Sequence, residues 1–415
     1  MPLHARVAAI FAAYFFGLGL FLPFFPLVLS EAGLSPGEIG TLLAIPMLVR
    51  LAANPLIGAA VDRFGTPGRA VALLSILAAV AFSGFFIAKS FFASAVLLVV
   101  ISIAWSPLMP LGDALAARVE REGKGDYGRM RLWGSVSFIV ANVIGGVLIG
   151  EWTTGVVVGG IVAGLVAAGA AAFSVKLPRI RVDENESVSI ASPDTALAEV
   201  MEEGAPRALP ARRRGLAALL REGAFVTPGF LLVILAAGCA QASHAAYYAF
   251  SALHWSQTGV SGAAVGIYWG LGVITEIGLF AASARVRAAL GVNGLLAIGI
   301  AGAVLRWILF PFVEDPVSIV LVQLLHGLSF GATHLGAVAF VARMAPPQWA
   351  GAAQGVNSMV IGAVTALASA AAGVLYASSP VSAFLAMSAL SGIGGLCLVA
   401  GLVVSNRAKR ASRTG

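Results

Sequence analysis

Charge is scarce in this sequence. Only 11% of its 415 residues are Asp, Glu, Lys or Arg, whereas 59% are hydrophobic. A soluble domain of this length needs more polar surface than such a composition supplies, so the chain is expected to lie in a lipid bilayer. Cysteine is scarce too: Cys239 and Cys397 both lie within apolar runs, and we interpret them as small buried thiols rather than a disulfide or a metal site.

Several motifs of soluble enzymes are missing as well. The sequence contains no nucleotide-binding loop after a strand, no metal-ligand spacing and no nucleophile elbow. The chain is therefore predicted not to be an enzyme, and to use no cofactor and no metal. Its net charge of +7 would suggest nucleic acid as a partner of a soluble protein, but the location of the charges explains it without nucleic acid.

Long apolar runs dominate what is present. In hydrocarbon a single segment satisfies its own backbone only as a helix, so each run of about twenty apolar residues predicts one membrane span. The predicted fold is an all-α membrane protein with twelve transmembrane helices in two six-helix bundles. We expect bundles at 1–176 and 227–405, a linker loop at 177–226 and a tail at 406–415. The predicted spans are 7–29, 37–60, 69–88, 92–117, 131–150, 153–175, 228–252, 261–284, 289–313, 317–342, 348–376 and 381–404.

The basic residues alternate from loop to loop in a way that predicts orientation. Of the 26 Lys and Arg residues, only Lys89 lies in a loop on one side, and only Arg50 and Arg306 lie within spans. All the others lie on the side of the two termini, which the positive-inside rule makes cytoplasmic. We therefore expect a multi-pass protein of a bacterial-type inner membrane, surrounded by lipid, with both termini in the cytoplasm, acting as a monomer.

The loop after the second predicted span carries a recognisable motif. Gly58 is followed by Asp62, Arg63 and Gly65, and a further basic residue, Arg69, comes a few positions later. This pattern resembles the conserved cytoplasmic loop motif of the major facilitator superfamily. The resemblance implies a conformational latch made by charges between helices, in which the carboxylate interacts with helix ends and Gly65 permits a tight turn.

Three further segments narrow the resemblance. They run from Tyr127 to Phe138, from Ser243 to Tyr248 and from His326 to His334, and Glu276 lies in the eighth predicted span. Together they look like the phenylpropionate permease group of the superfamily. The first segment is also similar to lactose permease and its oligosaccharide/proton symporter relatives. The resemblance implies secondary active transport, in which two halves rock around a central cavity.

Charged residues inside spans are costly and indicate function. Lactose permease-like symporters use an acid, an arginine and a histidine on helices 8, 9 and 10, where Glu276, Arg306 and His326 stand here. The resemblance implies that Glu276, with His326 or His334, binds the transported proton. Lactose permease has a second carboxylate where this chain has Ser329, so the proton-carrying group stays open. A static Glu276–Arg306 pair that fixes helix packing is the alternative.

A second pair of charged residues suggests a solute site. The spacing of Asp113 and Arg131 resembles the carboxylate–arginine pair that binds sugar in lactose permease, and Phe138 stands where that protein has a tryptophan. Arg131 alone would bind a carboxylate, and Arg50 would either attract an anion or pair with an acid across the bundle. An interfacial salt bridge between Asp113 and Arg131 is the alternative.

The seventh and eighth predicted spans add polar and aromatic candidates. Gln241, His244 and Tyr248 share one helix face by their spacing, which predicts a cavity wall that stacks and forms hydrogen bonds. Hydrogen bonds between helices within the bundle are the alternative for this face. Trp269 is a further candidate cavity aromatic, with packing towards lipid as its alternative.

The combined prediction is a permease that carries a small organic solute with protons. An aromatic or other carboxylate ranks first as the substrate, a sugar or nucleoside second, and proton-driven efflux of a drug-like compound third. The sequence does not distinguish symport from antiport. A non-transporting membrane sensor is the alternative from a different class.

Overall fold

The computed structural model describes residues 1–64, 67–175, 225–346 and 349–414. It contains 12 helical spans that are long and apolar enough to cross a membrane, and no strand among the described residues. The predicted all-α fold and the twelve spans are confirmed. Residues 177–224 of the predicted linker, Gly65, and the side chain of Asp62 lie outside what the structure describes, and the boundaries of the two bundles stay a prediction.

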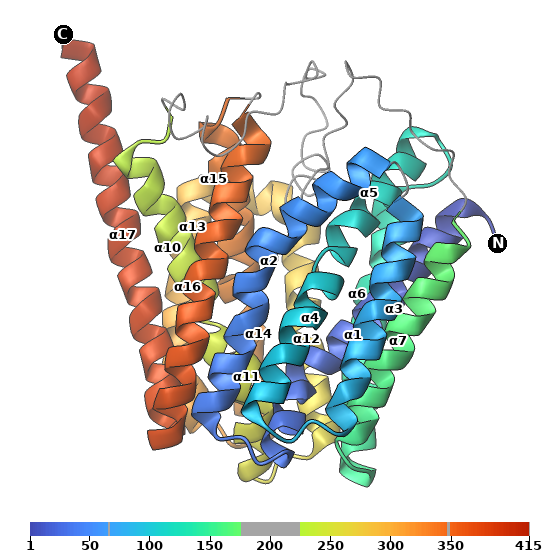
Figure 1. Cartoon of the computed structure of the whole chain (residues 1–415). Helices are drawn as coiled ribbons and strands as arrows, with labels where there is room; N and C mark the ends of the chain where they lie inside the picture. The colour runs from blue at the N-terminus through green and yellow to red at the C-terminus, as the bar shows by residue number, and fades with distance from the viewer. Residues whose placement is uncertain (65–66, 176–224, 347–348, 415) are drawn as a thin grey trace.

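Both halves are built from six spans each (Figure 1). The first half comprises α1 (Leu3–Glu31), α2 (Pro36–Phe64), α3 (Pro67–Ser83) with η1 (Gly84–Phe86), α4 (Phe91–Trp105) with α5 (Leu108–Arg121), α6 (Tyr127–Glu151) and α7 (Gly155–Phe173). The second comprises α10 (Pro228–Ala242) with α11 (Ala245–Gln257), α12 (Gly262–Ala281), α13 (Ser283–Leu309) with η2 (Phe310–Phe312), α14 (Pro316–Leu324) with η3 (Gly327–Ala332) and α15 (Thr333–Met344), α16 (Ala350–Ser378) and α17 (Pro380–Thr414).

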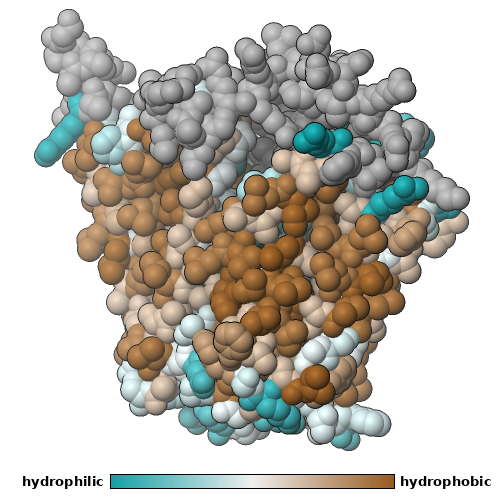
Figure 2. Space-filling model, viewed as in Figure 1, coloured by the Kyte–Doolittle hydropathy of each residue, from teal (hydrophilic) through white to brown (hydrophobic). Residues whose placement is uncertain are grey.

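The outer surface of the helices is apolar. Figure 2 shows a broad hydrophobic band over the visible face, with hydrophilic residues toward its ends. Leu73, Phe92 and Leu367 are among the large hydrophobic side chains that point outward, each more than 60% exposed. Such a surface is stable against lipid and unstable against water, so the protein is a multi-pass membrane protein.

Three of the predicted spans are interrupted well inside their length, and a further kink lies at Gly291, near the start of the predicted span 289–313. Ser106 and Pro107 separate α4 from α5, because a proline has no N–H to donate to the helix. Ser243 and His244 separate α10 from α11, and the π-helical turn η3 lies between α14 and α15. Breaks and π-turns inside membrane helices change the direction of the side chains that follow them, which decides what faces the centre of the molecule.

The two halves pack most closely at the end of the molecule opposite the termini. There α2 lies against α16, and α6 lies against α12. The backbone at Gly40 approaches Ser369 and Gly373, and the backbone at Gly262 approaches Gly146. Side chains at these glycines would collide with the opposite backbone, so small residues are what permits this close contact.

Candidate functional site

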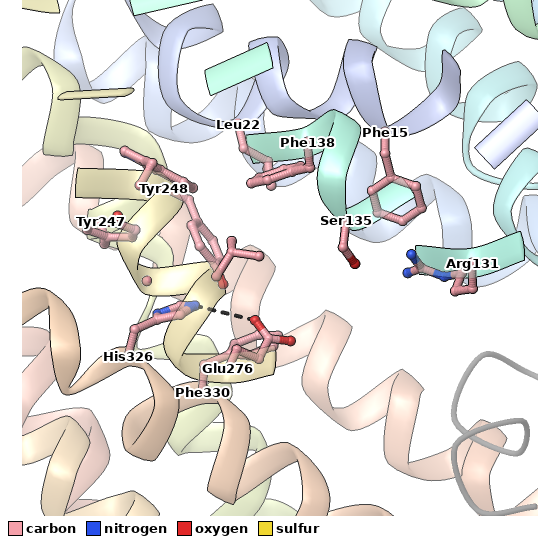
Figure 3. A pocket seen from close by; sticks show the side chains of 13 residues that line it. Phe15, Leu22, Arg131, Ser135, Phe138, Tyr247, Tyr248, Glu276, His326 and Phe330 are labelled. Carbon is pink, nitrogen blue, oxygen red and sulfur yellow. Dashed lines mark ion pairs between the residues drawn. The ribbon is translucent and has the colours of Figure 1, made fainter. Parts of the chain in front are cut away.

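A cavity lies between the two halves, near the middle of the spans (Figure 3). The cavity has a volume of about 220 Å³ and is partly open to its surroundings, which leaves room for a small solute. The first half contributes Phe15, Leu22, Arg131, Ser135 and Phe138, and the second contributes Tyr247, Tyr248, Trp269, Gly272, Val273, Glu276, His326 and Phe330.

Arg131 is the cationic group of the first wall. Its guanidinium carbon lies 4.0 Å from the centre of the Phe15 ring and 5.6 Å from that of Phe11. The two rings hold the cation by cation–π attraction and leave its N–H groups to other partners. Figure 3 shows the Arg131 side chain on the opposite side of the cavity from Glu276.

Asp113 lies behind this wall and is buried. Its Oδ1 accepts a hydrogen bond of 2.9 Å from the Tyr127 hydroxyl, and Tyr14 lies within electrostatic range of Arg50, Asp113 and Arg131. Asp113 and Arg131 therefore belong to one polar cluster, but only Arg131 lines the cavity. A solute in the cavity meets the cation first.

Glu276 and His326 form the polar part of the second wall. His326 Nε2 lies 3.7 Å from Glu276 Oε2, a contact drawn as a dashed line in Figure 3. Arg306 does not reach the cavity: its Nη1 donates a 2.8 Å hydrogen bond to His326 Nδ1. The predicted trio is thus arranged in series, with the histidine between the acid and the arginine.

This arrangement fixes the tautomer of His326. A guanidinium only donates, so Nδ1 of His326 must accept, and the proton of the neutral imidazole must sit on Nε2. Nε2 is the atom that faces Glu276. As long as the bond from Arg306 persists, His326 has no site for a second proton.

Arg306 is fully buried and is held by neutral side chains. Besides His326, its Nη1 lies 3.2 Å from Ser329 Oγ and its Nη2 lies 2.8 Å from Gln323 Oε1. Its guanidinium also lies 4.7 Å from the centre of the Tyr247 ring. Among the residues that the structure describes, no carboxylate contacts this cation directly, so it keeps a positive potential in the surrounding part of the bundle.

The remaining part of the second wall is aromatic. The rings of Tyr247 and Trp269 stack with centroids 4.5 Å apart, and Trp269 Nε1 donates to Ser251 Oγ. The ring centroids of Tyr248 and Trp269 lie 5.9 Å apart, and Phe138 lines the opposite wall. The structure therefore places Phe138, Tyr248 and Trp269 at the cavity, where flat apolar groups of a solute can stack.

Gln241 and His244 lie inside the second half, behind the cavity wall. The Gln241 amide donates to Phe330 O and to Thr333 Oγ1. His244 Nε2 lies 3.2 Å from Ser329 Oγ, while its Nδ1 faces backbone carbonyls. His244 and Tyr248 still lie next to each other, with ring centroids 5.9 Å apart, but of the three residues of the predicted common face Tyr248 is the one that lines the cavity.

The other predicted residues lie around this centre. The His334 ring is parallel to that of Phe330 at 6.0 Å, and His334 lies within electrostatic range of Glu276. The Arg50 side chain reaches the seam between the halves. Its Nη2 lies 3.8 Å from the point where a Cβ atom would stand if Gly362 were replaced by alanine. Gly58 and Arg63 end α2 and Arg69 begins α3, with both arginines exposed, so the latch role stays a prediction.

Three residues contribute to the site without having been predicted from the sequence. Phe15 supports Arg131, Tyr247 stacks on Trp269, and Gln323 holds Arg306. Gln323 precedes His326 by three residues and Ser329 follows it by three, so helical spacing alone would have placed both beside the histidine.

Comparison with known proteins identifies the family of the chain. The sequence profile of the MFS_1 like family matches residues 4–386. The chain belongs to this family. It is therefore a transporter of the major facilitator superfamily, not an enzyme, and carries a small-molecule substrate; the predicted resemblance is confirmed.

Two relatives of the chain come from bacteria. The chain is 31% identical over 336 residues to the probable 3-phenylpropionic acid transporter of Escherichia coli (strain K12), covering 79% of each protein. It is 34% identical over 166 residues to the maltose permease of Geobacillus stearothermophilus, covering 40% of this chain and 42% of that one.

Solved structures show the same fold at low identity. The nucleoside transporter NupG superposes with a TM-score of 0.77 at 16% identity, covering 97% of this chain and 99% of NupG. A bacterial homologue of the human lysosomal transporter Spinster, solved in an inward-facing and unoccupied conformation, gives a TM-score of 0.68 at 13% identity, covering 97% and 96%.

Proposed function

We propose that this protein is a proton symporter for a small organic carboxylate, with an aromatic carboxylate as the first candidate. The observation that carries the proposal is the placement of Glu276, backed by His326 and Arg306, across one cavity from Arg131. In this arrangement Glu276 exchanges the proton and Arg131 binds the anion, and both face the same solute. The relative named as a probable 3-phenylpropionic acid transporter supports this substrate class.

Glu276 is the proton carrier in this proposal. Glu276 and His326 both line the cavity, but Nδ1 of the His326 imidazole accepts from Arg306 and its Nε2 carries the ring proton, so His326 has no vacant position for a second proton. His334 lies beyond Phe330 and acts on Glu276 through its electrostatic field.

Charge couples the proton to the solute. Ionised Glu276 repels an anionic solute, while neutral Glu276 leaves Arg131 and the buried Arg306 to attract it. Proton and anion therefore bind with positive cooperativity, and each ligand raises the affinity for the other by the same factor. This cooperativity is what drives uphill symport in an alternating-access carrier.

The aromatic wall favours a ring on the solute. Trp269, Tyr248 and Phe138 surround the space between Arg131 and Glu276. A carboxylate at Arg131 would place an attached aromatic ring among these side chains, where stacking adds to burial of apolar area. In this proposal the substrate-binding roles of Asp113, Arg50, Gln241 and His244 are indirect, through the position of Arg131 and of the helices.

The protein is proposed to lie as a monomer in a bacterial inner membrane with both termini in the cytoplasm. Figure 1 places the two ends of the chain on the same side of the bundle. The basic residues that flank the spans lie mostly on that side, as the positive-inside rule requires of a cytoplasmic face. The close contact of the halves at the opposite end then corresponds to an inward-facing state.

A sugar is the second candidate substrate. Tyr127, Asp113 and Arg131 offer hydroxyl, carboxylate and guanidinium groups in one cluster, a set that binds sugar hydroxyls well. The maltose permease relative, which supports this alternative, matches 40% of the chain. The aromatic wall and the excess of cations favour the carboxylate.

Proteoliposomes test the proposal directly. Addition of 3-phenylpropionate to the outside is expected to alkalinise the external medium, because protons enter with the solute. Maltose and uridine serve as the alternative solutes, and Glu276→Gln is the control that should give no proton signal. Alkalinisation with maltose or uridine instead of the carboxylate would overturn the substrate class, and solute uptake without any proton movement would overturn symport.

A further inference from the structure

Gln323 lies at the centre of the buried hydrogen bonds of the second half. It is fully buried and lies on α14, one turn before His326. Its side chain makes three hydrogen bonds of 2.8 Å, to Arg306, to the Tyr247 hydroxyl and to the backbone carbonyl of Tyr268. We infer that Gln323 is the positioning residue that couples proton binding at Glu276 to the aromatic wall at which the solute binds.

The orientation of the Gln323 amide admits one solution. The guanidinium of Arg306 only donates, so the atom facing it must be Oε1. The carbonyl of Tyr268 only accepts, so the atom facing it must be Nε2. In the flipped orientation the amide N–H groups would face the donors of Arg306, and Oε1 would face the carbonyl oxygen of Tyr268. Because Nε2 therefore lies on the side of Tyr268 and Tyr247, the Tyr247 hydroxyl accepts a hydrogen bond from it.

On one side Gln323 reaches the solute wall. The Tyr247 ring stacks on Trp269 at 4.5 Å, and both side chains line the cavity. A solute that displaces either ring moves the hydroxyl to which Gln323 donates. Because the amide is held at three points in a buried site, this displacement passes to Oε1 rather than being absorbed by solvent.

On the other side Gln323 reaches the proton site. It holds Nη2 of Arg306, and Nη1 of the same planar group donates to His326 Nδ1. A guanidinium is rigid, so a shift of Nη2 turns Nη1 and with it the imidazole. His326 Nε2 faces Glu276 Oε2 at 3.7 Å, so rotation of the imidazole changes the position of the N–H group that faces the carboxylate.

The connection therefore runs from Tyr247 through Gln323, Arg306 and His326 to Glu276, and its middle members Gln323 and Arg306 lie behind the cavity wall. It operates in both directions: protonation of Glu276 should alter the environment of Tyr247 and of the stacked Trp269. This inference rests on the proposed proton role of Glu276 and adds a second path of coupling to the direct repulsion across the cavity.

Trp269 provides a probe that needs no solute. We would record the tryptophan fluorescence of the purified full-length protein between alkaline and acidic pH, and take the part lost in Trp269→Phe as the signal of Trp269. The wild type should show an acid-induced change of this signal that Glu276→Gln abolishes. Gln323→Leu and, separately, Tyr247→Phe should each remove most of that change, because each interrupts the connection at a different point.

Gln354 supplies the matched control. It is another buried glutamine of the same half, and its amide donates to the Val338 carbonyl away from the proton site. Gln354→Leu should leave the change intact. If Gln323→Leu does not fold, Tyr247→Phe carries the test, since it keeps the ring and its stacking.

The outcomes separate the two proposals. A Glu276-dependent change that survives in Gln323→Leu, or in Tyr247→Phe where the first variant does not fold, overturns the role of Gln323 alone. A wild-type change that is equal in Glu276→Gln overturns the proton role of Glu276, and the role of Gln323 with it. Loss of the change in Gln354→Leu as well would show a general effect of buried substitutions and would also overturn the inference.

Discussion

The two halves of the molecule treat their central arginines differently. Arg131, in the first half, reaches the cavity between the rings of Phe15 and Phe11. Arg306, in the second, is completely buried and bound by three neutral side chains. One cation is therefore available to a solute, while the other is available only to the protein's own acid through His326.

The difference extends to the helices that carry these residues. α6 is continuous and brings Arg131, Ser135 and Phe138 to the cavity on one face. The second half instead contains the break before α11 and the π-turn η3, which begins next to His326. A regular helix suffices to present a binding group, whereas an internal hydrogen-bond network requires local distortions to bring its members together. The predictions below test this division between the cation proposed to bind the solute and the acid proposed to bind the proton.

The largest effect is expected from removing the acid. Glu276→Gln keeps the shape and the hydrogen-bonding capacity of the side chain but cannot exchange a proton. Proton-driven accumulation of solute in proteoliposomes should fall to equilibration, while counterflow exchange persists. Uphill uptake at the wild-type rate in this variant would show that the second half does not carry the proton.

The next effect concerns the solute cation. Arg131→Gln should weaken binding of a carboxylate by about 1.5–3 kcal/mol, the usual contribution of hydrogen bonds to charged groups. This corresponds to roughly 10- to 100-fold in affinity. Isothermal titration with 3-phenylpropionate measures it.

Arg129→Gln is the control for this substitution. Arg129 is exposed at the beginning of the same helix and lies away from the central cavity. Its replacement should leave the affinity near the wild-type value. Equal loss in both variants would indicate a general effect of surface charge and would remove Arg131 from the solute site.

A smaller effect is expected at the seam between the halves. A methyl group at Gly266 would collide with the backbone carbonyl of Asn142 in the opposite half. Gly266→Ala should therefore destabilise the observed closed contact by about 1–3 kcal/mol, as overpacking usually does. The population should shift toward a state that is open at the end opposite the termini.

Spin labels measure this shift. Labels at the exposed positions Lys89 and Ser256, one in each half at that end, should report longer distances in Gly266→Ala. Gly278→Ala, on the same helix but with no neighbouring atom within 4 Å, should leave the distances unchanged. Unchanged distances in Gly266→Ala would show that the seam tolerates the methyl group.

The smallest effect concerns the caps of two corresponding helices. Ser90 accepts from Ala93 N at the start of α4, and Asp315 accepts from Val317 N and Ser318 N at the start of α14. Hydrogen bonds from Ser318 and Val317 hold the pKa of Asp315 below its ordinary value. This contribution to stability is present above the pKa of the unfolded chain and is lost as the pH falls through the pKa of the folded protein.

Asp315→Asn tests this dependence. Asparagine caps a helix as well as aspartate does but does not titrate, so thermal unfolding of the variant should be less sensitive to pH below about pH 4 than that of the wild type. Ser90→Ala should lower the melting temperature equally at all pH values. A variant Asp315→Asn with wild-type pH sensitivity would show that the cap contributes nothing measurable.

Much of the fold was predictable because lipid imposes a simple rule. Each run such as 37–60 or 381–404 had to be a helix, and the structure extends these two runs to Pro36–Phe64 and Pro380–Thr414. The break at Ser243 and His244 was not predictable in the same way, since both residues occur within regular membrane helices. Helical spacing placed His244 beside Tyr248, where the structure has their ring centroids 5.9 Å apart, but it could not show that Gln241 and His244 form their hydrogen bonds inside the bundle.

Within the site, the sequence by itself determined which residues are ionisable and on which spans they lie: Glu276, Arg306 and His326 each require an explanation in a bilayer, whatever the packing. Only the tertiary structure decided that Arg306 binds His326 rather than Glu276, and that Ser329 and Gln323 complete its surroundings. The reason is physical: the cost of a buried charge depends on local composition, but its partner depends on the rotation and bending of three helices, which the whole core sets.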